Sequence, residues 1–291
     1  PFLPKDYCQI SIDREHEAYL QYYFPEIKRG PFLPLAGTSL WKEDTLPKWE
    51  ERPYDVVFTG NYTPLSKFEP TIERHGKEYA DFYYGIIEDF KKHPHLGMDI
   101  GIREHLLSEV EDITEDGVKE MMPNMIMIDL YVRNYFRGKV VQTLVDAGVS
   151  VHCFGAGWEF LPCEHPENLI KEGGVDSLAC LQALSKAKVS LNVMPWFKDG
   201  AHDRVFNSML NGAVCFTDWS RYLAENLRDG EDIFFYELDA LECLPDMVQG
   251  ILENRKKWEY MQKAAYETAE KSHTWEHRAG AVHKEILSKI R

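Results

Sequence analysis

Residues 189–218 read VSLNVMPWFKDGAHDRVFNSMLNGAVCFTD. The apolar run Val189–Met194 is typical of a buried strand, Val205–Leu210 follows a helical pattern, and Ala213–Thr217 is a second apolar run. A strand that passes through a helix to a second strand of the same sheet does so as a right-handed crossover between parallel strands. This stretch therefore predicts a parallel β-sheet covered by helices.

The same alternation continues on both sides of this stretch. Further apolar strands are expected at Tyr54–Gly60, Val149–Phe154 and Ile233–Tyr236, whereas residues 63–147 are helical in pattern throughout and residues 240–290 almost entirely so. Strands that alternate with helices, each a nearly continuous apolar run, indicate a sheet buried on both faces. The predicted fold class is α/β: a Rossmann-like doubly wound parallel sheet with a large helical insertion.

The chain is expected to divide into three parts. Residues 1–50 are rich in proline and aromatic residues and are too short for a core of their own, which favours the tail of a preceding domain plus a linker. The alternative is an N-terminal arm packed on the main domain. Residues 51–270 are expected to form the sheet domain, with the helical insertion at 63–147, and residues 271–291 a C-terminal helix.

Composition excludes several classes of protein. The 291 residues carry a formal net charge of −15, which argues against nucleic-acid binding because a phosphate backbone would be repelled. No apolar stretch reaches the roughly 18–20 residues of a membrane-spanning helix, so we expect no integral membrane contact. No secretory signal is visible, and the six cysteines include no CxxC pair, so the expected location is the cytoplasm.

Ligands of an open parallel sheet bind at the carboxyl ends of its strands. The residues that follow the predicted strands fall in four stretches: Gly60–Asn61, Gly155–Trp158, Pro195–Arg204 and Thr217–Asp218. The fold would bring them to one edge. We therefore expect the functional site there.

Two of these stretches carry a recognisable pattern. The stretch Gly155-Ala-Gly157-Trp158 departs from the dinucleotide-binding motif GxGxxG, because Phe160 stands where the motif has its third glycine. The two glycines indicate a tight turn. This turn either lets the backbone approach a ligand or serves to pack Trp158.

Downstream, a helix is expected to begin near Asp203 as N-cap, with His202 and Arg204 beside its free N–H groups, which would bind phosphate oxygens. Solvated helix-start charges are the alternative. The sequence has no P-loop, HExxH or GxSxG motif, so ATPase, zinc-protease and hydrolase activities lack support.

Residues 188–218 resemble the donor-binding half of the GT-B glycosyltransferases. More narrowly, they resemble the bacterial spore-maturation-protein-like glycosyltransferases, whose C-terminal domain is a group-1 type transferase domain. The phrases DREHEAYLQYYFPEIKRGPFLPLAGT at 13–38, YDVVFTGNY at 54–62, VSVHCFGAGWE at 149–159 and HTWEHRAG at 273–280 agree in order along nearly the whole chain.

The resemblance has several implications. It implies a nucleotide-diphosphate sugar as donor, transfer of the sugar to an unknown acceptor (a glycan, a protein or a small molecule), and no metal or other cofactor. Residues 1–50 would then be the remnant of an acceptor-binding N-terminal domain. Residues 271–291 would be a helix that crosses back toward it.

The resemblance also assigns roles to residues. Related retaining enzymes carry two acids eight positions apart; the matching positions here are Asp199 and Asn207, and an Asn can hold ribose hydroxyls only by uncharged hydrogen bonds. Asp199, His202 and Arg204 are expected at the reaction centre, where Arg204 would stabilise charge on the β-phosphate. The expected donor-binding residues are Gly60, Asn61, Gly155, Gly157, Trp158, Arg204, Asn207, Thr217 and Asp218.

Some questions stay open at this stage. Arg133 and Arg137 lie one turn apart on one helix face and are either extra phosphate contacts or part of a solvated face. Besides a glycosyltransferase, the sequence is compatible with a catalytically idle donor-binding or assembly module and with a GT-B-type nucleotide-sugar epimerase. Retaining or inverting stereochemistry is not determined.

Overall fold

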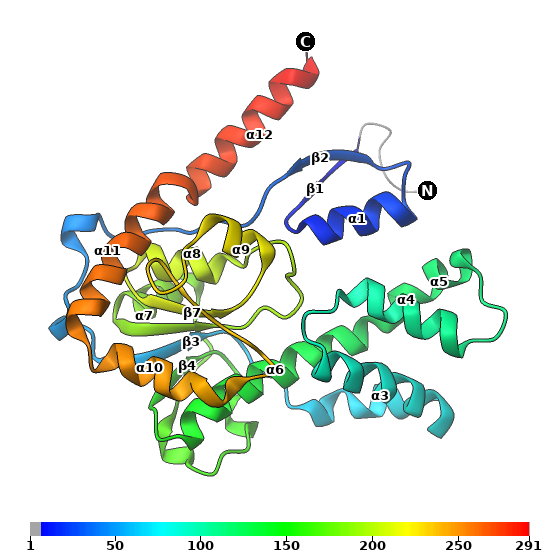
Figure 1. Ribbon diagram of the computed structural model, residues 1–291, viewed down its shortest axis with the longest axis horizontal. Helices are drawn as coiled ribbons and strands as arrows, with labels where there is room; N and C mark the ends of the chain where they lie inside the picture. Colours follow the sequence, from blue (N-terminus) through cyan, green and yellow to red (C-terminus); the bar gives the residue numbers. More distant parts are fainter. Residues whose placement is uncertain (1–6, 291) are drawn as a thin grey trace.

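A six-stranded parallel sheet forms the centre of the protein (Figure 1). The computed structural model describes residues 7–290, so the first six residues of the predicted 1–50 segment and Arg291 lie outside it. The strand order is β5-β4-β3-β6-β7-β8, and a separate pair of parallel strands, β1-β2, lies near the N-terminus. The strands are β1 Cys8–Ser11, β2 Lys28–Phe32, β3 Tyr54–Thr59, β4 Val151–Phe154, β5 Leu169–Gly173, β6 Ala187–Asn192, β7 Val214–Asp218 and β8 Phe234–Tyr236.

Twelve α-helices are described within residues 7–290. They are α1 Arg14–Tyr23, α2 Glu69–Glu73, α3 Lys77–Lys92, α4 Met98–Glu109, α5 Glu115–Met121, α6 Ile126–Asp146, α7 Ser177–Ser185, α8 Asp203–Leu210, α9 Arg221–Asn226, α10 Leu244–Leu252, α11 Arg255–Ser272 and α12 Trp275–Ile290.

The predicted doubly wound α/β sheet is confirmed. The central strand β3 pairs in parallel with β4 on one side and β6 on the other, with Val56 opposite Val151 and Val189. Because both faces of β3 are covered, Val56, Val57 and Phe58 are fully buried. Sequence reasoning missed β5, an edge strand that pairs with β4 alone and whose residues Lys171 and Glu172 break the apolar pattern.

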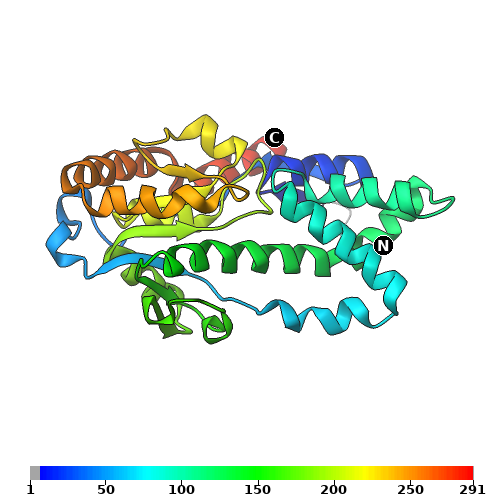
Figure 2. The same cartoon turned by 60° about the horizontal axis from the view of Figure 1, so that its bottom comes forward.

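The predicted helical insertion is confirmed as α2 to α6 between β3 and β4. Figure 2 shows α6 running along the sheet and extending beyond it, where α3, α4 and α5 gather around its first half. Val140, Val141 and Leu144 of α6 belong to the same buried cluster as Val56 and Phe58 of β3. The second half of α6 is therefore anchored in the sheet domain, while its first half carries the other inserted helices.

The segments before and after the sheet domain contact each other. The backbone N–H of Gly37 donates to the carbonyl of His273 at 2.9 Å, and Arg278 Nε donates to the carbonyl of Pro34 at 2.7 Å. Arg52 is buried and donates to the carbonyls of Ala187 and Asn211, and burial lowers its pKa to about 9. These bonds bind residues 33–53 to the sheet domain and to the start of α12.

The sequence predicted neither a membrane-spanning helix nor a disulfide framework. None of the helices within residues 7–290 is long and apolar enough to span a bilayer. All six cysteines lie within residues 7–290, and no disulfide joins any two of them.

Candidate functional site

A cleft of about 390 Å³ opens at the carboxyl ends of β3, β4 and β6. We call it the donor cleft. Its walls come from the loops after β3 and β4, from one side of α7, from the first turns of α8, and from Thr38 in the linker, Val175 and Trp275 of α12. It is lined by Thr38, Thr59, Gly60, Asn61, Phe154, Gly155, Val175, Ser177, Cys180, Leu181, Leu184, His202, Asp203, Arg204, Asn207 and Trp275.

The floor of the donor cleft requires glycine at two positions. A Cβ on Gly155 would lie 2.2 Å from the carbonyl oxygen of Gly60, and a Cβ on Gly60 would lie 2.7 Å from Nη1 of Arg204. Both residues have positive φ values, 157° and 152°. Asn61 holds the loop in place because its Oδ1 accepts from the N–H of Ala156 at 2.9 Å. The two strand ends therefore approach each other closely enough to expose backbone to a ligand.

Helix α8 begins one residue earlier than expected. Its N-cap is His202 rather than Asp203, and the Nδ1 of His202 accepts from the N–H of Arg204 at 3.2 Å. Burial lowers the pKa of His202 to about 4, and the charge of Arg204 adds to this shift. His202 is therefore neutral at pH 7. The first turn of α8 faces the donor cleft, because His202, Asp203 and Arg204 line it.

Arg204 holds the sheet edge together. Its Nε donates to Oδ1 of Asn192 at 2.9 Å, its Nη1 to the carbonyl of Thr59 at 2.9 Å and its Nη2 to the carbonyl of Val193 at 3.1 Å. A guanidinium has five N–H donors, so two remain for a ligand in the cleft that Arg204 lines. Burial lowers the pKa of Arg204. The residue joins the ends of β3 and β6 as well as facing the site.

Arg137 is not on a solvated face. Its Nη1 donates to the carbonyl of Asn61, and its Nε is buried without a partner. Burial, together with the charges of Arg204 and Arg133, lowers the pKa of Arg137 to about 9. Among the described residues no carboxylate forms an ion pair with Arg137. Arg133 differs, because Asp129 neutralises it.

Asn207 lies in the donor cleft but is already bonded within the protein. Its Oδ1 accepts from the N–H of Thr38 at 2.8 Å, and its Nδ2 donates to Asp203 at 3.1 Å. The residue thus connects α8 to the linker. A ribose hydroxyl would have to share or replace the bond to Thr38.

Three of the expected site residues do not line the donor cleft. The buried carboxylate of Asp199 pairs with Arg14 at 2.9 Å and Arg221 at 3.2 Å. Gly157 packs against Tyr62, whose carbonyl leaves no room for a Cβ. Trp158 is 1% exposed and donates from Nε1 to the carbonyl of Gly60. Its ring is stacked on Tyr62, so it offers no free face for a base.

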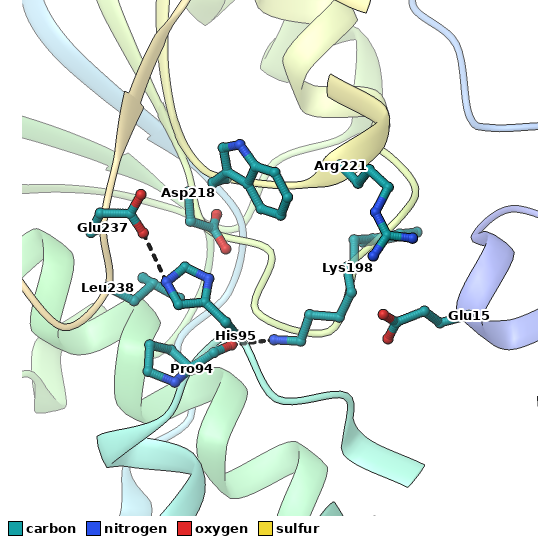
Figure 3. Close-up of a pocket in the computed structure, with 10 residues that line it drawn as sticks. Glu15, Pro94, His95, Lys198, Asp218, Arg221, Glu237 and Leu238 are labelled. Carbon is teal, nitrogen blue, oxygen red and sulfur yellow. Dashed lines mark hydrogen bonds and ion pairs between the residues drawn. The ribbon is translucent and has the colours of Figure 1, made fainter. Parts of the chain in front are cut away.

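The two residues that end β7 are also apart from the donor cleft. The hydroxyl of Thr217 is buried and accepts from Nδ2 of Asn192 at 2.8 Å. Asp218 accepts from the N–H of Met194 at 2.8 Å, and burial raises its pKa to about 7. Figure 3 shows its carboxylate at a second, smaller cavity that Lys198 and Glu15 also line.

Sequence reasoning missed the apolar part of the lining of the donor cleft. Phe154, Val175, Leu181 and Trp275 form it, and Trp275 is 47% exposed. Trp275 stands within the phrase HTWEHRAG, but only the return of α12 to the linker brings it to the cleft. An exposed tryptophan beside a cleft is a stacking surface that Trp158 cannot provide.

Solved structures with the same fold include several glycosyltransferases. The GtfA/B complex has a TM-score of 0.50 and 12% identity, over 97% of this chain and 45% of that chain. TarM has a TM-score of 0.51 and 11% identity, over 96% and 42%. HepE of Anabaena in complex with UDP-glucose has a TM-score of 0.50 and 10% identity, over 96% and 63%. The chain thus spans roughly half the length of these structures, and the likeness shows the fold.

The sequence itself matches a family. No curated protein matches the chain. The model of a family described as "Glycosyl transferase-like" matches residues 137–284, which include the end of α6, the sheet from β4 to β8 and most of α12. Because this match covers half of the chain and the fold is that of GT-B enzymes, the chain belongs to the glycosyl transferase-like family and has the Rossmann-like architecture of a GT-B glycosyltransferase.

Proposed function

We propose that the donor cleft binds a nucleotide-diphosphate sugar and that the protein transfers the sugar to an acceptor without a metal ion. The observation that carries this proposal is the pair Arg137 and Arg204 beside the first turn of α8. Both side chains are cationic and burial lowers the pKa of both. Among residues 7–290 neither forms an ion pair with a carboxylate, although the charges of Asp203 and Asp218 raise the pKa of Arg204. A diphosphate supplies the missing negative charge.

The shape of the donor cleft supports an order for the parts of the donor. The exposed ring of Trp275 in the lining suits a nucleobase, which stacks on aromatic side chains. The middle, with Asn207 and the N–H of Thr38, suits ribose hydroxyls. The end with Asn61 and Arg204, next to Arg137, suits the diphosphate. HepE, which has a similar fold, is solved with UDP-glucose, which supports uridine nucleotides as the first donors to test.

The chemistry follows from this placement. An acceptor oxygen forms a bond to the anomeric carbon while the bond from that carbon to the β-phosphate oxygen breaks. The electron pair of the broken bond leaves with the nucleoside diphosphate, and the proton of the acceptor hydroxyl passes to the departing β-phosphate oxygen. Negative charge therefore grows at the β-phosphate, where the unpartnered Nε–H of Arg137 and the two spare N–H groups of Arg204 stabilise it.

A second candidate function is a donor-binding module without turnover. The observation that favours it is the position of Asp199, which is held by Arg14 and Arg221 outside the donor cleft, so the acid expected at the reaction centre is absent from it. An epimerase is the third possibility that the same experiment separates.

The test is calorimetric titration of the chain with UDP, ADP and GDP, with and without EDTA, followed by incubation with the matching nucleotide sugars. We expect binding that EDTA does not change, and release or transfer of the sugar. Binding without turnover supports the module, and a new nucleotide sugar supports the epimerase. Binding that EDTA abolishes and Mn²⁺ restores refutes metal independence, and a failure of all three nucleotides to bind refutes the proposal.

A further inference from the structure

A third cavity, of about 250 Å³, lies between α1, α4, the start of α6 and the loop after β6. We call it the insertion cavity. It shares no lining residue with the donor cleft. Its lining residues are Glu15, His16, Tyr19, Met98, Asp99, Ile102, Met122, Pro123, Met125, Ile126, Asp129, Arg133, Trp196 and Lys198. Most of its wall therefore comes from the helical insertion and from the N-terminal segment.

The insertion cavity has an apolar wall with a polar end. Met98, Met122 and Met125 lie in the wall, and methionine side chains adapt their shape to different apolar ligands. Glu15 and Asp99 lie at the polar end, and burial raises the pKa of both carboxyl groups. Carboxyl oxygens in such a place accept hydrogen bonds from hydroxyl groups. This combination suits an alcohol with an apolar body.

The charges of the insertion cavity select against anions. Three carboxyl groups (Glu15, Asp99 and Asp129) face two cations, and one of these cations, Arg133, is already paired with Asp129. Figure 3 shows the other, Lys198, donating to the carbonyl of Pro94, with Glu15 close by. An anionic ligand would meet unpaired carboxylates there. The occupant that fits is a neutral molecule.

Trp196 stands between the insertion cavity and the donor cleft. Its ring lines the insertion cavity and lies 4.3 Å from the guanidinium carbon of Arg133 and 6.0 Å from that of Arg137. On the other side, the ring centre of Trp196 is 5.9 Å from that of His202, which lines the donor cleft. The two cavities are therefore neighbours at the point where Arg137 would hold the diphosphate.

We propose that the insertion cavity is the acceptor site and that the acceptor is a neutral alcohol with an apolar body, its hydroxyl group at the polar end, where Lys198 lies close to Glu15 and two residues from Trp196. This proposal rests on the proposed function, because an acceptor must lie beside the leaving diphosphate. It assigns a role to the helical insertion, which forms most of the wall.

The test uses n-octyl β-D-glucoside below its critical micelle concentration as a neutral probe and octanoate as an anionic one, titrated into the full chain. The variant is Ile126→Asp, because Ile126 is 50% exposed at the cavity mouth and an acid suits the first position of α6. The matched control is Ile100→Asp, since Ile100 is 47% exposed on α4 and does not line the cavity.

We expect the glucoside to bind the unchanged protein more tightly than octanoate. Ile126→Asp should weaken glucoside binding about tenfold, whereas Ile100→Asp should change it less than about twofold. UDP affinity should be the same in all three proteins. Equal loss in both variants, tighter binding of octanoate or no binding of the glucoside would overturn the acceptor proposal.

The experiment distinguishes a failure of the acceptor proposal from a failure of the proposed function. If UDP binds and the glucoside does not, the acceptor proposal alone is refuted. If no nucleotide binds while the glucoside binds in a way that depends on Ile126, the proposed function is refuted and the insertion cavity is supported as a site for an apolar alcohol.

Discussion

Replacing Arg137 by methionine should stabilise the protein and weaken nucleotide binding at the same time. Burial and the charges of Arg204 and Arg133 lower the pKa of Arg137 from 12.5 to about 9. At about 1.4 kcal/mol per pKa unit, this shift limits the cost of holding the charge to about 5 kcal/mol. Methionine keeps an apolar body beside Phe58 and Trp196 but loses the bond to Asn61. We therefore expect a net gain of about 1–2 kcal/mol in the free energy of unfolding.

The same substitution removes the unpartnered Nε–H and the positive charge beside Arg204, which lines the donor cleft. Hydrogen bonds to charged groups contribute about 1.5–3 kcal/mol, so UDP affinity should fall by roughly 10- to 150-fold. The assays are urea denaturation without ligand and calorimetric titration with UDP. Lys139→Met is the matched control, since Lys139 is an exposed cation on the same helix and should change neither quantity.

The prediction requires both changes in the same variant: a gain in the free energy of unfolding and a loss of UDP affinity. Saturating UDP should raise the melting temperature of the unchanged protein, and this rise should be much smaller in Arg137→Met. A variant that is less stable and binds UDP as tightly as the unchanged protein refutes the reasoning, because Arg137 would then be a structural residue whose charge is compensated within the fold.

Three other substitutions test the site. Arg204→Lys should lower the free energy of unfolding by about 2–4 kcal/mol in urea denaturation, because an ammonium cannot reach the three acceptors that the guanidinium holds; unchanged stability contradicts this. Asp218→Asn should match the unchanged protein at pH 4 and be more stable above pH 7, by at most about 4 kcal/mol. The pKa of Asp218 is raised to about 7 in the folded protein, so this carboxyl group ionises at lower pH in the unfolded chain than in the folded one. The unchanged protein should therefore lose stability as the pH rises from about 4 to 7, whereas Asp218→Asn should not. Parallel pH profiles of stability for the two proteins would refute this. Trp275→Ala should weaken UDP binding by about 1–3 kcal/mol, the scale of base stacking, with Trp219→Ala, exposed but outside the donor cleft, as the control.

The order of strands and helices was predictable because it depends on local patterns. Apolar runs such as Val189–Met194 and the glycines that end them are read over a few residues, and parallel pairing through right-handed crossovers then follows. The two strand-end positions Gly60 and Gly155 were predicted in the same way, because the carboxyl edge of a parallel sheet collects such loops. The edge strand β5 was missed because an edge strand needs no continuous apolar run.

Side-chain roles at the site depended on contacts between distant parts of the chain. The sequence placed Asp199 and Asn207 eight positions apart, but the loop after β6 buries Asp199 against Arg14 and leaves only Asn207 in the donor cleft. Trp158 was a reasonable stacking candidate by position, and the sheet buried it.

Arg137 shows most clearly what tertiary structure decides. Helical periodicity places Arg137 on the helix face that also carries Arg133, and the neighbouring residues in the sequence do not predict different environments for the two side chains. In the fold, Asp129 neutralises Arg133, whereas Arg137 is half-buried against the loop after β3 and close to Arg204. Backbone periodicity is set by neighbours along the chain, so the sequence alone determined the sheet and its edge. Burial and charge balance are set by residues that only folding brings together, so tertiary structure decided which of the two arginines lacks a carboxylate partner and lies near Arg204.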